Sequence, residues 1–375
     1  MTAFDRMCIS PANPGASYRR LKAEIDSAVC RVLNSGLYIL GREVEAFEQE
    51  FASYLGAMYA VGVANGTDAI ELALRVAGVE QGDIVITVSH TAVATVSAIE
   101  RLGARPCLID ISPNTYTMDP VALQHALNGP ARNARAVMPV HLYGHPADMD
   151  RIMQIAQENN LVVIEDCAQA HGSTFHGQRV GGIGHLGTFS FYPTKNLGAL
   201  GDGGAITTNE STIADRLRML RQYGWRERFI SEAVGVNSRL DELQAAILRV
   251  KLPHLEADNK KRRSIAALYA RGLDGLPLQL PKVSTNCEHV FHQFTVETDR
   301  RDDLQHFLSS MNIGTSVLYP VPVHLQPAYY GRILCAGSLF HTERAAKRIL
   351  SLPIYPELQD GQVEEICRAI RTFFG

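Results

Sequence analysis

The chain has 375 residues, and its formal net charge of −3 provides no attraction to nucleic acid or to an anionic membrane. A hydrophobic content of 46% and a charged content of 20% are those of a globular protein. This length exceeds what one simple core accommodates, so we expect a large domain and a smaller one.

Cysteine usage and the chain start bear on the compartment. The seven cysteines are scattered and form no Cys-x-x-Cys pair, which predicts reduced thiols rather than a disulfide or zinc framework. The start, Met1-Thr2-Ala3-Phe4-Asp5-Arg6, lacks the layout of a signal peptide. No apolar run is long enough to span a bilayer. We therefore expect a cytoplasmic protein with no membrane or nucleic-acid partner.

The first half of the chain alternates between helical and β patterns. Residues 19–55 read as helices, because apolar side chains recur on one face. Near-continuous apolar runs then predict strands at 59–63, 84–88, 106–110, 136–140 and 161–164. The helices predicted between them lie at 70–78, at 92–102, from 120 onward and at 148–159. Strands of this kind indicate an α/β fold with a mostly parallel sheet sandwiched by helices.

The pattern changes after residue 187. Short β runs at 187–192 and 204–208 lie close together, followed by helices at 211–222 and 239–251 and a long Lys- and Arg-rich helix from Pro253 to about 272. The remainder mixes strands at 290–297 and 315–319 with helices at 301–311, 342–350 and 361–373. We therefore predict a large domain, residues 1–254, and a smaller C-terminal α+β domain, residues 255–375.

Lys195 and Asp166 are the most informative residues. Lys195 lies in the stretch Phe189-Ser190-Phe191-Tyr192-Pro193-Thr194-Lys195-Asn196, and Asp166 ends an apolar strand. Pyridoxal phosphate (PLP) chemistry needs a lysine amine for a Schiff base and a carboxylate that keeps the pyridine nitrogen protonated. Taken singly, an ordinary surface lysine and a helix cap or ion pair are strong alternatives.

Two further segments suit a phosphate. Asn65-Gly66-Thr67 lies between a strand and a helix, where backbone N–H groups and a hydroxyl can bind an anion; by itself it is more often only a turn and a cap. Ser190 could add a second hydroxyl, and Gly201-Asp202-Gly203-Gly204 would allow a close backbone approach.

Two other sites are not supported. The loop Gly181-Gly182-Ile183-Gly184 lacks the following helix and the acidic residue of a dinucleotide fingerprint. The histidines show no metal-ligand spacing on a helix, so no metal site is expected.

Taken together, the motifs resemble those of the DegT-type nucleotide-sugar aminotransferases, a branch of the fold-type I PLP enzymes. The similarity runs from about residue 10 to the end, and the order and spacing of five motifs together make it specific. The matching segments are Asn65-Gly66-Thr67-Asp68-Ala69-Ile70, Glu165-Asp166-Cys167-Ala168-Gln169-Ala170-His171-Gly172, the Lys195 stretch, Gly201-Asp202-Gly203-Gly204 and Gly235-Val236-Asn237-Ser238-Arg239-Leu240-Asp241-Glu242.

The resemblance implies roles for individual residues. Lys195 would carry the cofactor and then move the proton, and Asp166 would pair with the pyridine nitrogen. Gln169 would lie near the phenolic oxygen of the cofactor. The phosphate would be held by Gly66, Thr67 and Ser190 and, from the other subunit of a homodimer with shared active sites, by Asn237.

This chain departs from the family pattern at two positions. Ala92 follows Ser89-His90-Thr91, where members often carry an aromatic residue that stacks on the cofactor. Leu318 precedes Tyr319-Pro320, where members often carry a histidine, although His324 is present.

The resemblance also implies the reaction, an amino-group transfer from L-glutamate to a keto group of a nucleotide-linked deoxysugar. The segment Asn65-Gly66-Thr67-Asp68 favours a dTDP-3-keto-6-deoxyhexose as the substrate. A 4-keto UDP- or GDP-sugar is the alternative. A catalytically idle PLP-binding regulator is a further alternative, but a regulator would not need Lys195, Asp166 and a phosphate cradle together.

Overall fold

A computed structural model describes residues 9–375. The signal-peptide expectation rests on Met1 to Arg6, which lie outside these residues. Among the described residues, no helix is both long and apolar enough to cross a membrane.

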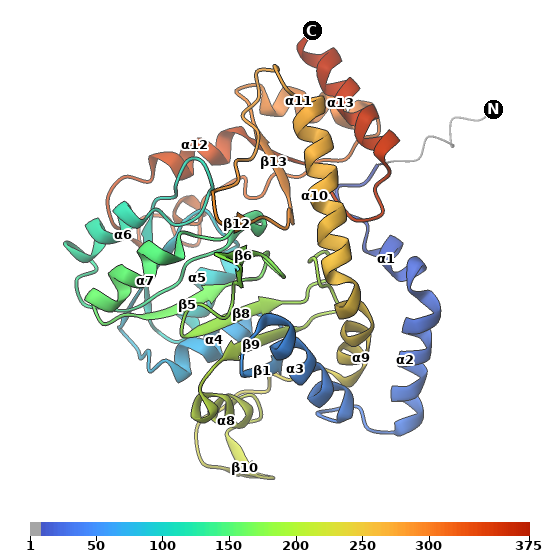
Figure 1. Ribbon diagram of the computed structural model, residues 1–375. Helices are drawn as coiled ribbons and strands as arrows, with labels where there is room; N and C mark the ends of the chain where they lie inside the picture. Colours follow the sequence, from blue (N-terminus) through green and yellow to red (C-terminus); the bar gives the residue numbers. More distant parts are fainter. Residues whose placement is uncertain (1–8) are drawn as a thin grey trace.

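An eight-stranded sheet forms the centre of the molecule (Figure 1), with the order β1-β9-β8-β5-β4-β2-β3-β14. Its strands are β1 (Tyr59–Val63), β2 (Ile84–Val88), β3 (Arg105–Ile109), β4 (Ala134–Val137), β5 (Val162–Asp166), β8 (Leu186–Ser190), β9 (Gly204–Thr208) and β14 (Leu334–Cys335). Neighbouring strands from β8 to β14 pair parallel, whereas β9 runs antiparallel to both β8 and β1. The prediction of a mostly parallel sheet between helices is confirmed.

Helices cover both faces of this sheet. The helices before residue 255 are α1 (Pro14–Arg20), α2 (Lys22–Ser35), α3 (Arg42–Leu55), α4 (Gly66–Val76), α5 (Val93–Arg101), α6 (Pro120–Leu127), α7 (Met149–Glu158), α8 (Ser211–Leu220) and α9 (Glu242–Lys251). One core joins α4, α5 and α8 to the sheet, and two others join the opposite face to α6 and α7 and to α3 and α9. Consecutive β5 residues alternate between these cores, since Val163 lies in one and Ile164 in another.

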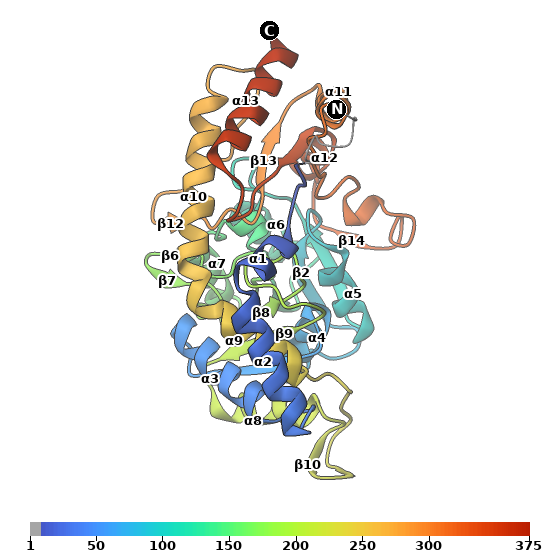
Figure 2. The ribbon, with the colours of Figure 1, turned by 90° about the vertical axis from the view of Figure 1, so that its right-hand side faces the viewer.

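The C-terminal region has its own core. It packs α10 (Leu255–Gly272), α11 (Arg301–Ser310) and α13 (Asp360–Phe374) against the pair β13 (Phe294–Glu297) and β15 (Ile349–Leu352). In Figure 2, α10 and α13 stand side by side along one edge. Two segments cross between the regions, because Ile9 pairs with Ile313 and β14 pairs with β3. The division at residue 254 stays a prediction.

Some predicted elements were wrong in detail. Residues 315–319 form no strand, and Ser316 makes only an isolated bridge to Ser351. The helix expected at 342–350 is α12 (Phe340–Arg348), and the chain then turns at once into β15. The 290–297 strand is limited to β13. Tertiary pairing decides these cases, because each short apolar run is compatible with more than one structure.

A hairpin projects from the body of the molecule (Figures 1 and 2). It consists of β10 (Trp225–Glu227) and β11 (Ile230–Ser231). The remaining short elements are β6 (Thr174–Phe175), β7 (Gln178–Arg179), β12 (Cys287–Glu288) and the 3-10 turns η1 (Leu142–Gly144), η2 (Leu252–His254) and η3 (Val323–Leu325). We call residues 223–238, which include this hairpin, the arm.

Candidate active site

Asp166 ends β5 at the carboxyl edge of the parallel strands, where ligands of open α/β sheets collect. Its side chain is buried and accepts hydrogen bonds from Thr95 Oγ1 at 2.9 Å and from the Ala168 N–H at 3.2 Å. Burial raises the pKa of Asp166, while these two bonds and the nearby charge of Lys195 oppose the rise. The carboxylate therefore favours a positively charged partner.

Lys195 follows β8, the strand beside β5, so the register of the two strands sets its position relative to Asp166. The side chain is partly buried, and its backbone N–H donates to the Tyr192 carbonyl at 2.9 Å. Burial lowers the pKa of the Lys195 amine to about 8, against the opposing effect of Asp166. An appreciable fraction of the amine is therefore neutral, and thus nucleophilic, near neutral pH.

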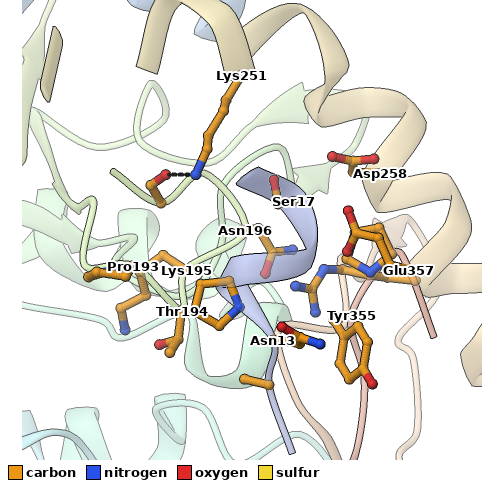
Figure 3. A pocket seen from close by; sticks show the side chains of 15 residues that line it. Asn13, Ser17, Pro193, Thr194, Lys195, Asn196, Lys251, Asp258, Tyr355 and Glu357 are labelled. Carbon is orange, nitrogen blue, oxygen red and sulfur yellow. Dashed lines mark hydrogen bonds between the residues drawn. The ribbon is translucent and has the colours of Figure 1, made fainter. Parts of the chain in front are cut away.

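The turn that carries Lys195 is hydrogen-bonded to neighbouring segments. Lys251 of α9 donates to the Gly198 carbonyl at 2.6 Å (Figure 3). Asn196 donates to Asn259 Oδ1 at 2.9 Å and to the Val290 carbonyl at 3.1 Å. These contacts tie the turn to α9 and α10, so the lysine stands on a fixed support.

The predicted phosphate residues converge at the N-terminus of α4. Asn65 Oδ1 caps the helix by accepting from the Asp68 N–H at 2.9 Å, and the first N–H groups, those of Gly66 and Thr67, have no carbonyl within the helix. A Cβ atom at Gly66 would lie 2.7 Å from the Ser190 Cβ. Glycine is therefore required for α4 to approach Ser190 this closely.

Gln169 lies at the same edge of the sheet, between two tyrosines. Its Oε1 accepts from the Tyr143 N–H at 2.7 Å, and its Nε2 donates to the Tyr319 hydroxyl at 3.1 Å. Burial and the charge of Asp166 raise the pKa of Tyr319, so this hydroxyl stays protonated. Tyr319 thus brings the C-terminal region to the predicted site.

His90 and His324, which lie near the positions that depart from the family pattern, each contact another segment of the site. His90 is fully buried, and its Nε2 lies 2.9 Å from the Tyr143 hydroxyl, which in turn donates to the Leu318 carbonyl. Burial lowers the pKa of His90 to about 4, so the ring is neutral. His324 Nδ1 lies 2.7 Å from Ser89 Oγ, which joins the Tyr319–His324 segment to the end of β2.

Asn237 differs from the other predicted site residues because it is exposed. Its side chain is exposed, and helix α9 begins after Asp241, so Asn237 does not cap that helix. The next residue, Ser238, accepts a hydrogen bond from the Ala64 N–H at 3.1 Å. The base of the arm therefore lies beside the turn that leads into α4.

Sequence reasoning missed Thr95, Tyr143 and Tyr319 as partners of the site. Thr95 lies in the first turn of α5, and its hydroxyl is 2.9 Å from that of Thr91, which precedes the helix. Tyr319 belongs to the Tyr319-Pro320 pair of the family pattern, but only the fold brings it and Tyr143 to Gln169.

The chain was compared with known proteins. The model of the DegT/DnrJ/EryC1/StrS aminotransferase family matches residues 19–371. The chain belongs to this family. A protein of Streptomyces venezuelae named dTDP-3-amino-3,4,6-trideoxy-alpha-D-glucose transaminase is 47% identical, over 96% of this chain and 94% of its own. A pleiotropic regulatory protein of Geobacillus stearothermophilus is 44% identical, over 95% and 96% of the two chains.

Among solved structures, DesV of S. venezuelae in complex with a ketimine intermediate superposes with a TM-score of 0.93. The two chains are 47% identical, and the match covers 96% of this chain and 97% of that one. The protein is thus a PLP-dependent aminotransferase. The amine of Lys195, the buried carboxylate of Asp166 and the Gly66–Ser190 approach fit this cofactor.

Proposed function

We propose that this enzyme transfers the amino group of L-glutamate to the keto group of a dTDP-3-keto-6-deoxyhexose. The whole-length similarity to a relative named as a dTDP-3-amino sugar transaminase carries this proposal. The pair formed by Lys195 and Asp166 supplies the chemistry.

In this proposal, Asp166 would accept a hydrogen bond from the protonated pyridine nitrogen of the cofactor. Thr95 and the Ala168 N–H hold the carboxylate in one orientation. When bound, the cofactor supplies an electron sink for the bond broken next to its amine. The first N–H groups of α4 and the hydroxyls of Thr67 and Ser190 would bind its phosphate.

Lys195 would hold the cofactor covalently and, when free, its amine would accept the proton of the donor and return it. An amine with a pKa near 8 exchanges protons readily at neutral pH, because acid and base forms are both populated. Gln169 is fixed by its two tyrosine contacts and would lie near the phenolic oxygen of the cofactor.

A substrate panel tests the assignment. Purified enzyme is given L-glutamate and, in turn, dTDP-3-keto-, dTDP-4-keto-, UDP-4-keto- and GDP-4-keto-6-deoxyhexoses, and both 2-oxoglutarate and the amino sugar are measured. We expect the highest kcat/KM with the dTDP-3-keto sugar. A tenfold or greater preference for a 4-keto sugar would refute this substrate but retain the reaction.

The second part of this proposal is a homodimer with shared active sites. The arm exposes four large apolar side chains, namely Tyr223, Phe229, Ile230 and Val234. The end of α2 and the connection to α3 expose four more, namely Leu33, Leu37, Tyr38 and Ile39. The chain joins these regions closely, because Ile39 bridges to Asp241, which lies three residues after the arm and is the N-cap residue of α9. Exposed apolar clusters of this kind are typical of protein interfaces.

A mixing experiment tests whether Asn237 serves the partner subunit. Lys195→Ala subunits are combined with Asn237→Asp subunits, whose new negative charge repels a phosphate. With shared sites, a mixed dimer has one intact site, so activity returns to about half of the wild-type value per mixed dimer. No recovery despite proven subunit exchange would mean that each chain completes its own site, as the contact between Ser238 and Ala64 also allows.

We also propose a cytosolic location. The described cysteines, from Cys30 to Cys367, are all unpaired, which suits a reducing compartment. Cell fractionation tests this.

A further inference from the structure

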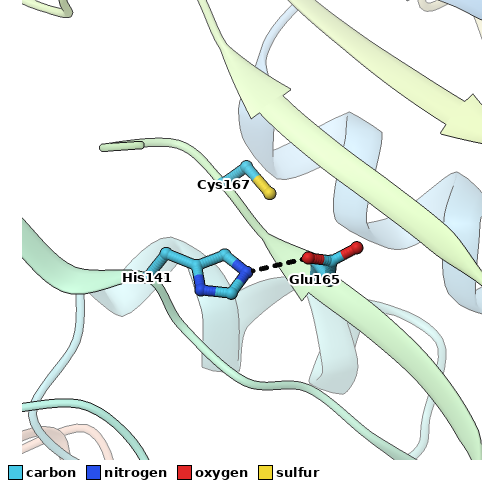
Figure 4. A group of neighbouring side chains, drawn as sticks. All are labelled: His141, Glu165 and Cys167. Atoms are coloured by element: carbon cyan, nitrogen blue, oxygen red, sulfur yellow. Dashed lines mark hydrogen bonds and ion pairs between the residues drawn. The ribbon is translucent and has the colours of Figure 1, made fainter. Parts of the chain in front are cut away.

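Glu165 precedes Asp166 on β5 and is a fully buried carboxylate, shown beside His141 and Cys167 in Figure 4. Successive side chains of a strand point to opposite faces, so Glu165 points away from the face of Asp166. Its Oε1 accepts from the N–H groups of Ile183 at 2.9 Å and Gly184 at 2.7 Å. Its Oε2 accepts from the Gly181 N–H at 2.9 Å and lies 3.1 Å from His141 Nε2. The glycine loop that resembles a dinucleotide motif therefore encloses a side chain of the protein itself.

The tautomer of His141 follows from its other contact. His141 Nδ1 accepts a hydrogen bond from the Ala147 N–H at 2.9 Å, so the ring proton of the neutral imidazole is on Nε2 and points to Glu165. Four donors thus surround the Glu165 carboxylate, and the ionised form satisfies all of them.

These bonds argue against a metal ion at this cluster. Ligand atoms of His141, Glu165 and Cys167 lie within 4.8 Å of one another, which is close enough for a metal site. However, both nitrogens of His141 and both oxygens of Glu165 are already in hydrogen bonds. Burial raises the pKa of the Cys167 thiol well above its ordinary value, so the thiolate that a metal prefers is disfavoured.

The network instead connects the two strands of the active site. The loop held by Glu165 leads directly into β8, which carries Ser190 and continues to Lys195. Thr188 of β8 also donates through Oγ1 to the Glu165 carbonyl at 3.0 Å. Glu165 therefore fixes the start of β8 against β5.

His141 closes the network around Asp166. Its backbone N–H donates to the Asp166 carbonyl at 3.0 Å, and the Asp166 N–H donates to the Pro139 carbonyl at 2.9 Å. His141 is thus bonded to Asp166 through its backbone and to Glu165 through its ring. A change at the ring would be transmitted to the strand end that carries Asp166.

We propose that Glu165 and His141 are positioning residues that hold Asp166 in register with Lys195 and with the cofactor. The proposal rests on the role given above to Asp166. Functional groups must be held within about 0.5 Å of their productive geometry, so a small slip of β5 against β8 would weaken the contact with the pyridine nitrogen.

Glu165→Gln tests the proposal, because the amide keeps the shape but presents an NH₂ group to two donors. The readout is the visible absorption of the bound cofactor as a function of pH. A less protonated pyridine withdraws fewer electrons from the cofactor's link to Lys195, so the midpoint should move to higher pH by about half a unit or more. We also expect kcat to fall about tenfold or more, with little change in KM for glutamate.

His141→Gln separates position from charge, because it leaves Glu165 charged. It should shift the midpoint in the same direction by a smaller amount, and it provides the test if Glu165→Gln does not fold. Glu242→Gln is the matched control. Glu242 is likewise buried and accepts from three backbone N–H groups, those of Gly41, Glu43 and Val44. It should lower Tm without moving the midpoint.

Two results would overturn the proposal. One is a Glu165→Gln variant whose Tm is lowered but whose midpoint and kcat equal those of the wild type. The same result in His141→Gln counts if only that variant folds. The other is one equivalent of tightly bound metal that is lost in His141→Gln. Asp166→Asn distinguishes the failures. If it moves the midpoint and the positioning variants do not, only positioning is wrong; if it has no effect either, the role of Asp166 is wrong.

Discussion

The sheet edge and the arm carry predicted site residues in opposite surroundings. At the sheet edge, Asp166 is buried and bonded to Thr95 and Ala168 of its own chain. On the arm, Asn237 is exposed, and Val234 is 85% exposed. The packing of one chain therefore fixes the first region, whereas the second presents groups that a partner could bury. We therefore expect single-atom changes at the sheet edge to alter the rate of the reaction, and changes on the arm to alter the association of subunits.

The largest effect is expected at Lys195. Lys195→Ala removes the only amine proposed to bind the cofactor and move the proton, so turnover should fall by more than about 10³-fold. Borohydride treatment of the wild type should fix the cofactor to Lys195, which peptide mapping detects. A label on another lysine would refute the assignment, and Lys347→Ala, on α12, is a suitable control.

Asp166→Asn should cost about two to three orders of magnitude in rate, because it removes the charge that keeps the pyridine protonated but nearly keeps the shape. The fold should survive, as circular dichroism and Tm can show. Turnover of glutamate within a few-fold of wild type would contradict the proposed role.

Substitutions on the arm should change the association of subunits and not the rate of the reaction. Phe229→Ser with Val234→Ser removes two exposed apolar side chains, each contributing about 1.5–3 kcal/mol if buried by a partner. Sedimentation should show that the dimer dissociates at protein concentrations at least tenfold higher. Val121→Ser, at a 76% exposed site on α6, should have no effect. An unchanged association constant would exclude the arm from the interface.

Thr95→Val tests the sheet edge at the level of one hydrogen bond. The bond lowers the pKa of Asp166, so its loss should raise that pKa further and weaken the carboxylate's charge. A bond to a charged group contributes about 1.5–3 kcal/mol, and partial compensation by Ala168 should leave a rate loss of about tenfold. Single-turnover kinetics with glutamate measure it, and Thr115→Val is the control for a half-buried hydroxyl that is bonded to Thr117 instead of Asp166.

The smallest expected effect is a pH dependence of covalent PLP binding that is due to Lys195. Burial lowers the pKa of its amine, so the neutral form increases as the pH rises through about 8. The rate at which cofactor-free enzyme binds PLP covalently should increase with pH over the same range. Stopped-flow absorbance would show this. A midpoint near the ordinary lysine value of about 10.4 would mean that the amine is not buried in solution.

The sequence by itself determined the family, the cofactor and the order of the main elements. Apolar runs that alternate with amphipathic segments are local patterns, and they give the parallel strands and their helices without knowledge of contacts. Lys195, Asp166 and the turn before α4 could be predicted as site residues because the proposed chemistry requires those residue types at those places in an α/β fold.

Only the tertiary structure decided what surrounds them. The loop Gly181–Gly184 reads as an unassigned glycine motif until the fold brings it under Glu165, and the bonds of Gln169 to Tyr143 and Tyr319 join residues far apart in the sequence. Strand β14 is likewise too short to predict, and it exists because β3 offers it an edge. Hydrogen bonds between distant segments have no sequence period, so their partners are set by the packing of the whole chain.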